Sequence, residues 1–219
     1  MRTFLVIGLG RFGSNLAIKL SQLGNEVLVV DRDEVAIERV APQVTRAQIG
    51  DCMDETVLHA LGVGNFDICF VCISDSFQAS LEVTSLLKDM GAKWVVAKAS
   101  RESQAKFLEK IGADEVICPE RDMAQRAAVK YSVKNAFEYI ELTPEYAIFE
   151  IQVSNCWVGK SLRELNIRGR HNVNVIGTKQ GKVVIPITDP DHVFQEQEHL
   201  IVAGSKVDVL RLMDAKRRN

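Results

Sequence analysis

The sequence predicts an α/β protein in which a doubly wound parallel sheet is followed by a second, smaller α+β domain. From residue 3 to about residue 120, short apolar runs alternate with longer segments of helical periodicity. The apolar runs are continuous, as expected for strands that helices cover on both faces. After about residue 137, short strand-like runs with short connections dominate, which is typical of a separate small domain.

The elements of the first domain follow in regular order. Six runs are the predicted strands, at residues 4–7, 27–30, 45–49, 68–73, 94–97 and 116–118, of which the one at 45–49 is weaker than the others. Between them lie the predicted helices, near residues 12–23, 34–40, 54–61, 77–90 and 103–111. Gly24, Gly91 and Gly112 stand where three of these helices should end, because glycine readily adopts the left-handed conformation of a C-cap.

A different helix is predicted to begin at Pro119, with Glu120 and Asp122 favourably placed in its first turn. Small and apolar side chains then share one helical face: Met123, Ala124, Ala127, Ala128 and Tyr131. Because the preceding sheet already has six strands and covering helices, we infer that this face packs against a second copy of the chain. The alternative is a helix that covers its own sheet.

The second domain is predicted to consist mainly of strands. These lie at residues 147–153, 174–178, 182–187 and 199–203, with helices at 160–165 and 207–213. We place the boundary within residues 138–145, so that the first domain covers residues 1–137 and the second residues 138–219.

Composition excludes several classes of protein. With 27 basic and 29 acidic side chains the formal net charge is −2, which offers no broad basic surface for nucleic acid. No apolar run approaches the roughly 18 residues that a membrane span needs, so a cytoplasmic protein is expected. Cys69 and Cys72 have redox or metal spacing, but within a strand they should point to opposite faces and lie in the core.

The strongest motif runs from Gly8 to Gly13, directly after the first strand, and also contains Gly10, Arg11 and Phe12. In such loops the first glycine permits a tight turn, the second lets a pyrophosphate approach, and the third lets helix and sheet pack closely. Asp31, at the end of the second strand, stands where a carboxylate can accept hydrogen bonds from ribose hydroxyls. The context indicates a nucleotide-binding Rossmann domain rather than an empty one.

Further polar residues follow the strand ends and complete a candidate nucleotide site. The negative charge of Asp31 disfavours a ligand with a 2′-phosphate, such as NADP. The positive charge of Arg32 partly offsets this repulsion. Arg11 can reach terminal phosphates as a bidentate donor, which suits ATP or ADP at least as well as NAD; a solvated arginine is the alternative. The remaining candidates are Asp51 and Cys52 after the third strand, beside adenine, and Ser74 and Asp75 after the fourth, near ribose or phosphate.

The sequence offers no convincing catalytic group, because none of its four histidines is placed as a proton donor beside a nicotinamide. We therefore expect a nucleotide that signals and a protein that is not an enzyme. The alternative is an NAD-dependent oxidoreductase with a Rossmann domain. A transcriptional regulator is opposed by the lack of a basic recognition helix.

Several of these segments together resemble one known family. They are the stretch from Val6 to Gly13, Val29 to Asp31, Gly50-Asp51, the run Lys110 to Glu120, and Asp122-Met123. They resemble the RCK family, the cytoplasmic regulatory subunits of Ktr and Trk potassium uptake systems, which contain TrkA-N and TrkA-C domains. The likeness covers essentially the whole chain and is nearer to Ktr subunits than to the duplicated Trk form.

The resemblance implies a dimer swapped through the helix after Pro119, an octameric ring of four dimers, and docking under a membrane-embedded potassium channel. ATP and ADP, or NADH and NAD, then bias the shape of the ring and gate potassium flow. It implies that Arg11 reaches the terminal phosphate from its own or the facing subunit. It further implies that Glu120 helps to hold a divalent or sodium cation between two nucleotide sites, and that Lys98 is a phosphate contact.

The second domain of some Ktr subunits binds cyclic di-AMP between two protomers. The matching region here contains Asn166, Ile167, Arg168 and, on the following strand, Asn174. In this reading Arg168 pairs with a phosphate and Ile167 packs on adenine. Residues 172–174 depart from the family pattern, and an arginine at a helix end is the alternative for Arg168.

Overall fold

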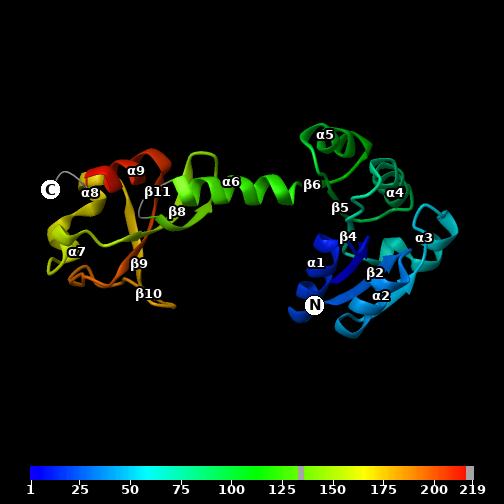
Figure 1. Cartoon of the computed structure of the whole chain (residues 1–219), viewed down its shortest axis with the longest axis horizontal. Helices are drawn as coiled ribbons and strands as arrows, with labels where there is room; N and C mark the ends of the chain where they lie inside the picture. Colours follow the sequence, from blue (N-terminus) through cyan, green and yellow to red (C-terminus); the bar gives the residue numbers. More distant parts are fainter. Residues whose placement is uncertain (133–135, 216–219) are drawn as a thin grey trace. The chain divides into compact units, whose positions relative to one another are not determined.

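The computed structural model describes residues 1–132 and 136–215. Contacts within the chain divide it into two compact units, residues Met1–Asp122 and Met123–Asn219 (Figure 1). Across the described part of the chain, no helix combines the length and apolar character that crossing a bilayer requires.

The first unit is built around a parallel sheet of six strands. In chain order its strands and helices are β1 (Thr3–Ile7), α1 (Arg11–Gln22), β2 (Glu26–Asp31), α2 (Glu34–Val40), β3 (Arg46–Ile49), α3 (Glu55–Leu61), β4 (Ile68–Val71), α4 (Phe77–Asp89), β5 (Val95–Lys98), α5 (Glu102–Ile111) and β6 (Glu115–Ile117), and α6 (Pro119–Ser132) follows. The strand order is β3-β2-β1-β4-β5-β6, which confirms the predicted doubly wound sheet. The order reverses between β1 and β4, where such sheets bind ligands beyond the carboxyl ends of the strands.

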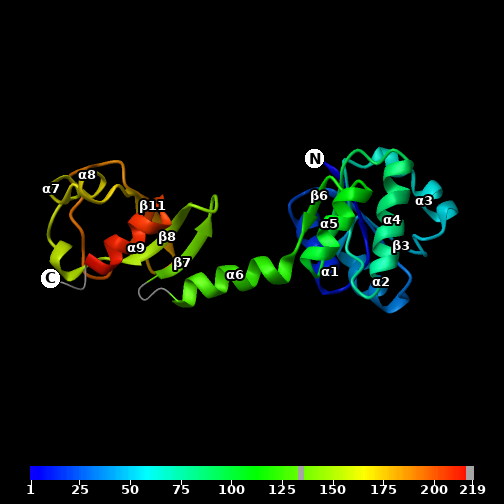
Figure 2. The same cartoon turned by 90° about the horizontal axis from the view of Figure 1, so that it is seen from above.

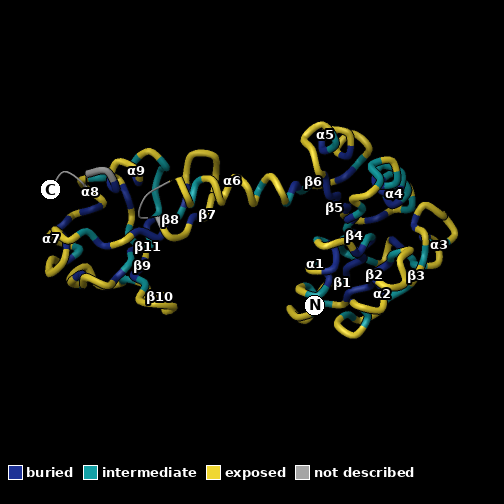
Figure 3. The backbone as a smooth tube through the Cα atoms, in the orientation of Figure 1, coloured by how far each residue is buried: buried dark blue, intermediate teal, exposed yellow. Residues whose placement is uncertain are grey.

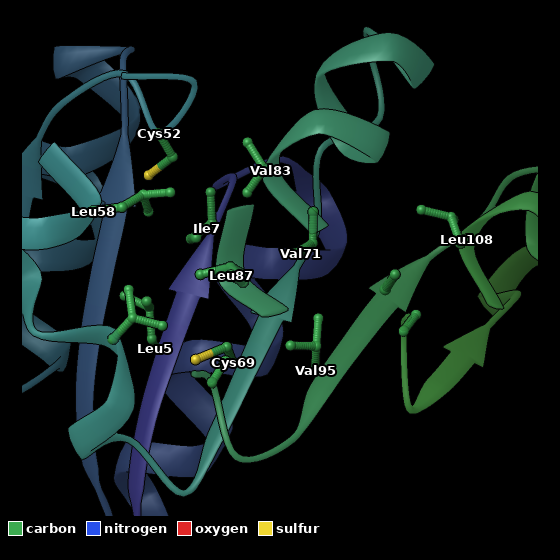
Figure 4. Packing of buried hydrophobic residues seen from close by; sticks show 14 of the residues in the cluster. Leu5, Ile7, Cys52, Leu58, Cys69, Val71, Val83, Leu87, Val95 and Leu108 are labelled. Atoms are coloured by element: carbon green, nitrogen blue, oxygen red, sulfur yellow. The ribbon is translucent and has the colours of Figure 1, made fainter. Parts of the chain in front are cut away.

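Helices cover both faces of this sheet, as its continuous apolar strands predict (Figure 2). On one face, α1 and α2 bury Ala17, Ala36 and Ile37 against β1 and β2. On the other, α3, α4 and α5 supply Leu58, Val83, Leu87 and Leu108, part of the cluster shown in Figure 4. Gly24, Gly91 and Gly112 all have positive φ after α1, α4 and α5, as predicted.

The two cysteines with redox spacing lie on opposite faces of the sheet. Cys69 packs with α4 in one core cluster, and Cys72 packs with the α1 and α2 cluster. Burial raises the pKa of both thiols to about 12, so both remain protonated at neutral pH. The expectation of buried core cysteines is confirmed.

The second unit contains an antiparallel sheet of five strands in the order β10-β9-β11-β8-β7. Its elements are β7 (Ala136–Glu141), β8 (Tyr146–Gln152), α7 (Leu162–Leu165), α8 (Ile167–His171), β9 (Asn174–Gln180), β10 (Val183–Pro186), β11 (His199–Ser205) and α9 (Lys206–Ala215). Short 3-10 turns lie at Ala41–Gln43 and Val63–Asn65 in the first unit and at Asn155–Trp157 in the second. Phe149, Phe194 and Leu212 belong to its core. The sequence-based boundary between residues 137 and 138 falls inside β7.

Helix α6 buries none of its residues (Figure 3). All five members of its small and apolar face are exposed, including Met123 at 62% and Tyr131 at 83%. The pairing of this face with a second copy of the chain stays a prediction.

Candidate nucleotide site

A cleft of about 490 Å³ lies at the carboxyl ends of the parallel strands. Its walls come from four strand ends and from α2 and α4. Residues predicted for the site that line it are Gly8, Gly10, Asp31, Arg32, Asp51, Cys52, Ser74 and Asp75. The fold thus brings together residues as far apart in the sequence as Gly8 and Asp75.

The loop between β1 and α1 requires glycine at two positions for internal reasons. Gly8 has φ +93°, a conformation that favours glycine, and a Cβ there would lie 3.0 Å from the backbone of Cys72. A Cβ on Gly13 would lie 2.0 Å from the carbonyl oxygen of Gly8. Gly13 therefore permits the close approach of α1 to the loop that the sequence predicts.

Gly10 has no such internal reason to be glycine. Its φ of −61° suits any residue, and apart from its two chain neighbours no residue has an atom within 4 Å of the position that a Cβ would take. Because Gly10 is exposed and lines the cleft, a side chain here would project into the space next to the loop. This cradle fits a ligand that approaches the backbone closely, such as a pyrophosphate.

The amino terminus of α1 has features that favour the binding of an anion. Side chains of Asp33, Asp54 and Ser76 cap α2, α3 and α4, whereas the N-cap of α1 is Gly10 and makes no side-chain hydrogen bond. The first turn of α1 contains no acidic residue and begins with Arg11. Free backbone amides and the positive end of the helix dipole together favour phosphate.

Asp31 is fixed at the end of β2 by two backbone amides. Its Oδ2 accepts a short hydrogen bond from the amide of Leu9, and its Oδ1 accepts one of 2.9 Å from the amide of Asp33. A carboxylate oxygen accepts more than one hydrogen bond, so both oxygens keep capacity for ribose hydroxyls.

Two arginines from the end of β2 and from α2 line the cleft. Arg32 forms an ion pair of 2.7 Å with Asp75, and both side chains are about two-thirds exposed. Arg39, which sequence reasoning missed, lies one helical turn after Ala36, and its Nη2 is 3.5 Å from the carbonyl oxygen of Leu9. Arg39 could have been found from the sequence, because it lies three residues after Ala36 and so shares one face of the helix that follows Asp31.

Cys52 lines the cleft but is buried. Burial, and then the charges of Asp51 and Asp31, raise the pKa of its thiol to about 12. Cys52 is therefore a neutral wall of the site at physiological pH. The carboxylate of Asp51 accepts a 2.9 Å hydrogen bond from the amide of Met53 and shapes the turn after β3.

Five predicted site residues do not line this cleft: Arg11, Phe12, Gly13, Lys98 and Glu120. Arg11 is exposed on α1, while Phe12 packs partly into the core. Lys98 donates hydrogen bonds to Ser74 Oγ and to Glu120 Oε1. Over residues 1–132 and 136–215, no three side chains of the histidine, cysteine or carboxylate type lie close enough together to hold a metal ion.

The residues considered for a second ligand have different surroundings. Ile167 is only 1% exposed and packs in the core of the second unit, so the expectation that it packs on adenine needs correction. The Asn166 side chain caps α8 by accepting a hydrogen bond from the amide of Gly169. Arg168 and Asn174 are exposed, at α8 and at the start of β9.

Comparison with known proteins supports the sequence resemblance. A TrkA-N domain model matches residues 4–119 and a TrkA-C domain model matches residues 146–216. Ktr system potassium uptake protein C of Bacillus subtilis (strain 168) is 40% identical over 210 residues, which cover 96% of this chain and 95% of the relative. Ktr system potassium uptake protein A of the same organism is 36% identical with the same coverage.

Solved structures with this fold include RCK domains. The crystal structure of the GsuK RCK domain matches with a TM-score of 0.67 at 19% identity, over 97% of this chain and 47% of that one. The GsuK channel bound to NAD matches with a TM-score of 0.63 at 20% identity, over 94% and 38%. GsuK bound to ADP matches with a TM-score of 0.53 at 16% identity, over 59% and 34%.

Fold and cleft together define a protein with a TrkA-N domain of the Rossmann type joined to a TrkA-C domain. The chain belongs to the RCK family of Ktr and Trk potassium uptake proteins.

Proposed function

We propose that this protein is a cytoplasmic, nucleotide-sensing regulatory subunit that gates a potassium uptake channel or transporter in the membrane. Relatives named as Ktr potassium uptake proteins, at 36–40% identity over nearly the full chain, support the role in potassium transport. The observation that carries the sensing role is Gly10, whose backbone is open to close approach by a ligand, at the mouth of a cleft that also holds Asp31.

We assign ATP or ADP as the preferred ligands, with NAD(H) as a further one. The loop amides and the α1 dipole would hold phosphate, and Asp31 would accept hydrogen bonds from ribose.

We further propose that the exposed face of α6 pairs two copies of the chain, that the pairs assemble into an octameric ring, and that the ring associates peripherally with the membrane through its channel partner. In this arrangement Arg11, exposed on α1, reaches a terminal phosphate from its own or the facing subunit, and Glu120 holds a cation there. A nucleotide shifts the equilibrium between two conformations of the ring only if it binds one of them more tightly than the other. We also propose that residues 1–137 and residues 138–219 are the two functional domains. In the second domain, we propose that Arg168 and Asn174 contact cyclic di-AMP.

A ligand panel with the purified full chain tests the proposal. Thermal stabilisation by ATP, ADP or NADH, together with an octamer-sized peak in gel filtration, is the expected result. Turnover of NADH with a small substrate would instead favour an oxidoreductase. In cells, deletion of the gene should impair potassium uptake, and normal uptake would refute the transport role.

A further inference from the structure

An ion pair bridges the two sides of the cleft. Arg32 directly follows β2, and Asp75 lies in the loop between β4 and α4. Arg32 Nη2 donates a hydrogen bond of 2.7 Å to Asp75 Oδ2, and both residues line the cleft. Because β1 lies between β2 and β4 in the sheet, these two strands are roughly 10 Å apart. The pair therefore spans the carboxyl end of β1, where the glycine loop begins at Gly8.

This strap, formed by Arg32 and Asp75, lies at the solvent side of the cleft. Its two side chains are 68% and 66% exposed, whereas Ile7 and Val30, which line the same cleft, are buried. The strap thus crosses above residues that form the floor of the cleft. An exposed ion pair contributes little to the stability of a fold, so the strap can open without loss of the sheet.

Asp75 differs from the other carboxylates that line the cleft. Asp31, Asp33 and Asp51 each accept a hydrogen bond from a backbone amide, which fixes them in the turns after β2 and β3. In the part of the chain that the structure describes, Asp75 accepts its hydrogen bond from Arg32 and none from a backbone amide. A ligand that takes Arg32 away therefore leaves the Asp75 side chain free to turn into solvent.

A phosphate on the glycine loop would compete with Asp75 for Arg32. The amides of this loop and the α1 dipole favour phosphate at the place that the strap crosses. A guanidinium binds phosphate in a bidentate way, and a phosphate carries more negative charge than one carboxylate. The same negative charge repels Asp75. Entry of the ligand would thus exchange one partner of Arg32 for another.

We propose that the strap of Arg32 and Asp75 is an autoinhibitory contact, which a phosphate-bearing nucleotide opens by taking Arg32 from Asp75. This role rests on the proposed binding of nucleotides, and it adds the contact that a nucleotide breaks when it enters the site. The affinity for the nucleotide is lowered by the free energy of that contact.

Calorimetry with ATP on the full chain tests the strap through a double-mutant cycle. The proteins are the wild type, Arg32→Gln, Asp75→Asn and the double variant, and both side chains are exposed, so no substitution disturbs the core. In the presence of Arg32, Asp75→Asn removes the repulsion of the phosphate and also the strap. In the Arg32→Gln background it removes the repulsion alone. The gain in ATP affinity from Asp75→Asn should therefore be about two- to fivefold larger with Arg32 than without it.

Arg163 and Asp191 supply the matched control, because they form an ion pair of 2.6 Å with similar exposure and do not line the cleft. Arg163→Gln, Asp191→Asn and their double variant should bind ATP as the wild type does. No heat of ATP binding by the wild type would defeat the nucleotide site itself. Binding of ATP with equal gains in the two backgrounds would overturn the strap alone. A smaller gain with Arg32 than without it would also overturn it, because the pair would then strengthen on binding.

Discussion

The carboxylate of Asp31 accepts a hydrogen bond from the backbone amide of Leu9, the residue between the first two glycines of the loop. The end of β2 and the loop after β1 are thereby held together across the mouth of the cleft. Ser14 Oγ donates to the Leu9 carbonyl at 2.8 Å and fixes the next peptide group of the loop. The proposed ribose contact thus also organises the proposed phosphate loop.

Replacing Asp31 should therefore weaken every ribose-bearing ligand. We expect Asp31→Ala to reduce the affinity for ATP, ADP and NADH by roughly 1 to 3 kcal/mol, because two charge-assisted hydrogen bonds are lost. Titration calorimetry measures this. Asp54→Ala is the control, since Asp54 caps α3 outside the cleft and should affect stability alone. Unchanged affinity in Asp31→Ala would remove Asp31 from the site.

The glycines at positions 10 and 13 should respond differently to alanine. Gly13→Ala places a Cβ against the Gly8 carbonyl and should destabilise the fold by several kcal/mol or prevent folding. Gly10→Ala meets no protein atom and should cost at most about 1 kcal/mol of stability. The affinity of Gly10→Ala for ATP should nevertheless fall at least tenfold. Thermal denaturation and calorimetry check both, and wild-type affinity in Gly10→Ala would show that nothing approaches this backbone.

Arg11 should distinguish ATP from ADP. Its side chain is exposed at the start of α1, where it can meet a terminal phosphate. We expect Arg11→Ala to weaken the binding of ATP by about 1 to 3 kcal/mol and that of ADP by less. Lys19→Ala, in the last turn of the same helix, should bind both as the wild type does. Equal losses for both nucleotides would refute contact with the terminal phosphate.

Thiol labelling should reveal the burial of the cysteines. Cys156 is exposed, whereas Cys52, Cys69, Cys72 and Cys118 are buried. Burial raises the pKa of Cys69 and Cys72 to about 12, and the thiolate is the reactive form. A thiol reagent at neutral pH should modify Cys156 rapidly in the native chain and the others only in denaturant. Rapid native labelling of a second cysteine would contradict this packing.

Acid should weaken the second unit through Glu150. This side chain is 4% exposed and pairs with Lys179 and His199, each at 2.6 Å. Burial alone would raise the pKa of Glu150, but the hydrogen bonds and charges of its two partners outweigh burial and lower it from 4.5. A carboxyl whose pKa is lower in the folded than in the unfolded state stabilises the fold at pH values above its unfolded pKa. This contribution to the free energy of unfolding is lost as the pH falls through the folded pKa.

We therefore expect Glu150→Gln to lower stability by about 1 to 3 kcal/mol at pH 7. The difference from the wild type should shrink as pH falls below 4.5 and through the lower, folded pKa of Glu150. Thermal unfolding monitored between pH 3 and pH 7 measures this, with Glu138→Gln, in an exposed pair with Lys130, as the control. A difference independent of pH would mean that the ion pairs contribute nothing.

The parallel sheet could be predicted because its signals are local. Apart from the third, at residues 45–49, each predicted strand is a short continuous apolar run, and each of Gly24, Gly91 and Gly112 closes a helix. β7 was not predicted, because Glu138 and Glu141 interrupt its apolar residues and its partner β8 defines it only after folding. The short helix α8 was missed for a similar reason, since left-handed Asn166 and Asn172 at its ends leave only Ile167–His171 between them.

The candidate site could be predicted where strand ends determine it. Gly8, Asp31, Asp51 and Ser74 all follow parallel strands, whose carboxyl ends meet at one edge. The burial of Ile167 and the bond between Lys98 and Glu120 depend on tertiary packing, which no spacing in the sequence encodes.

The contact between Gly13 and Gly8 also constrains any redesign of cofactor preference. A side chain at Gly13 would clash with the Gly8 carbonyl and displace α1 from the sheet, so only glycine fits at this position of the proposed phosphate loop. In the proposed nucleotide site, a preference for a ligand with a 2′-phosphate would have to be introduced at the end of β2 and on α2, where Arg32 and Arg39 line the cleft together with Asp31.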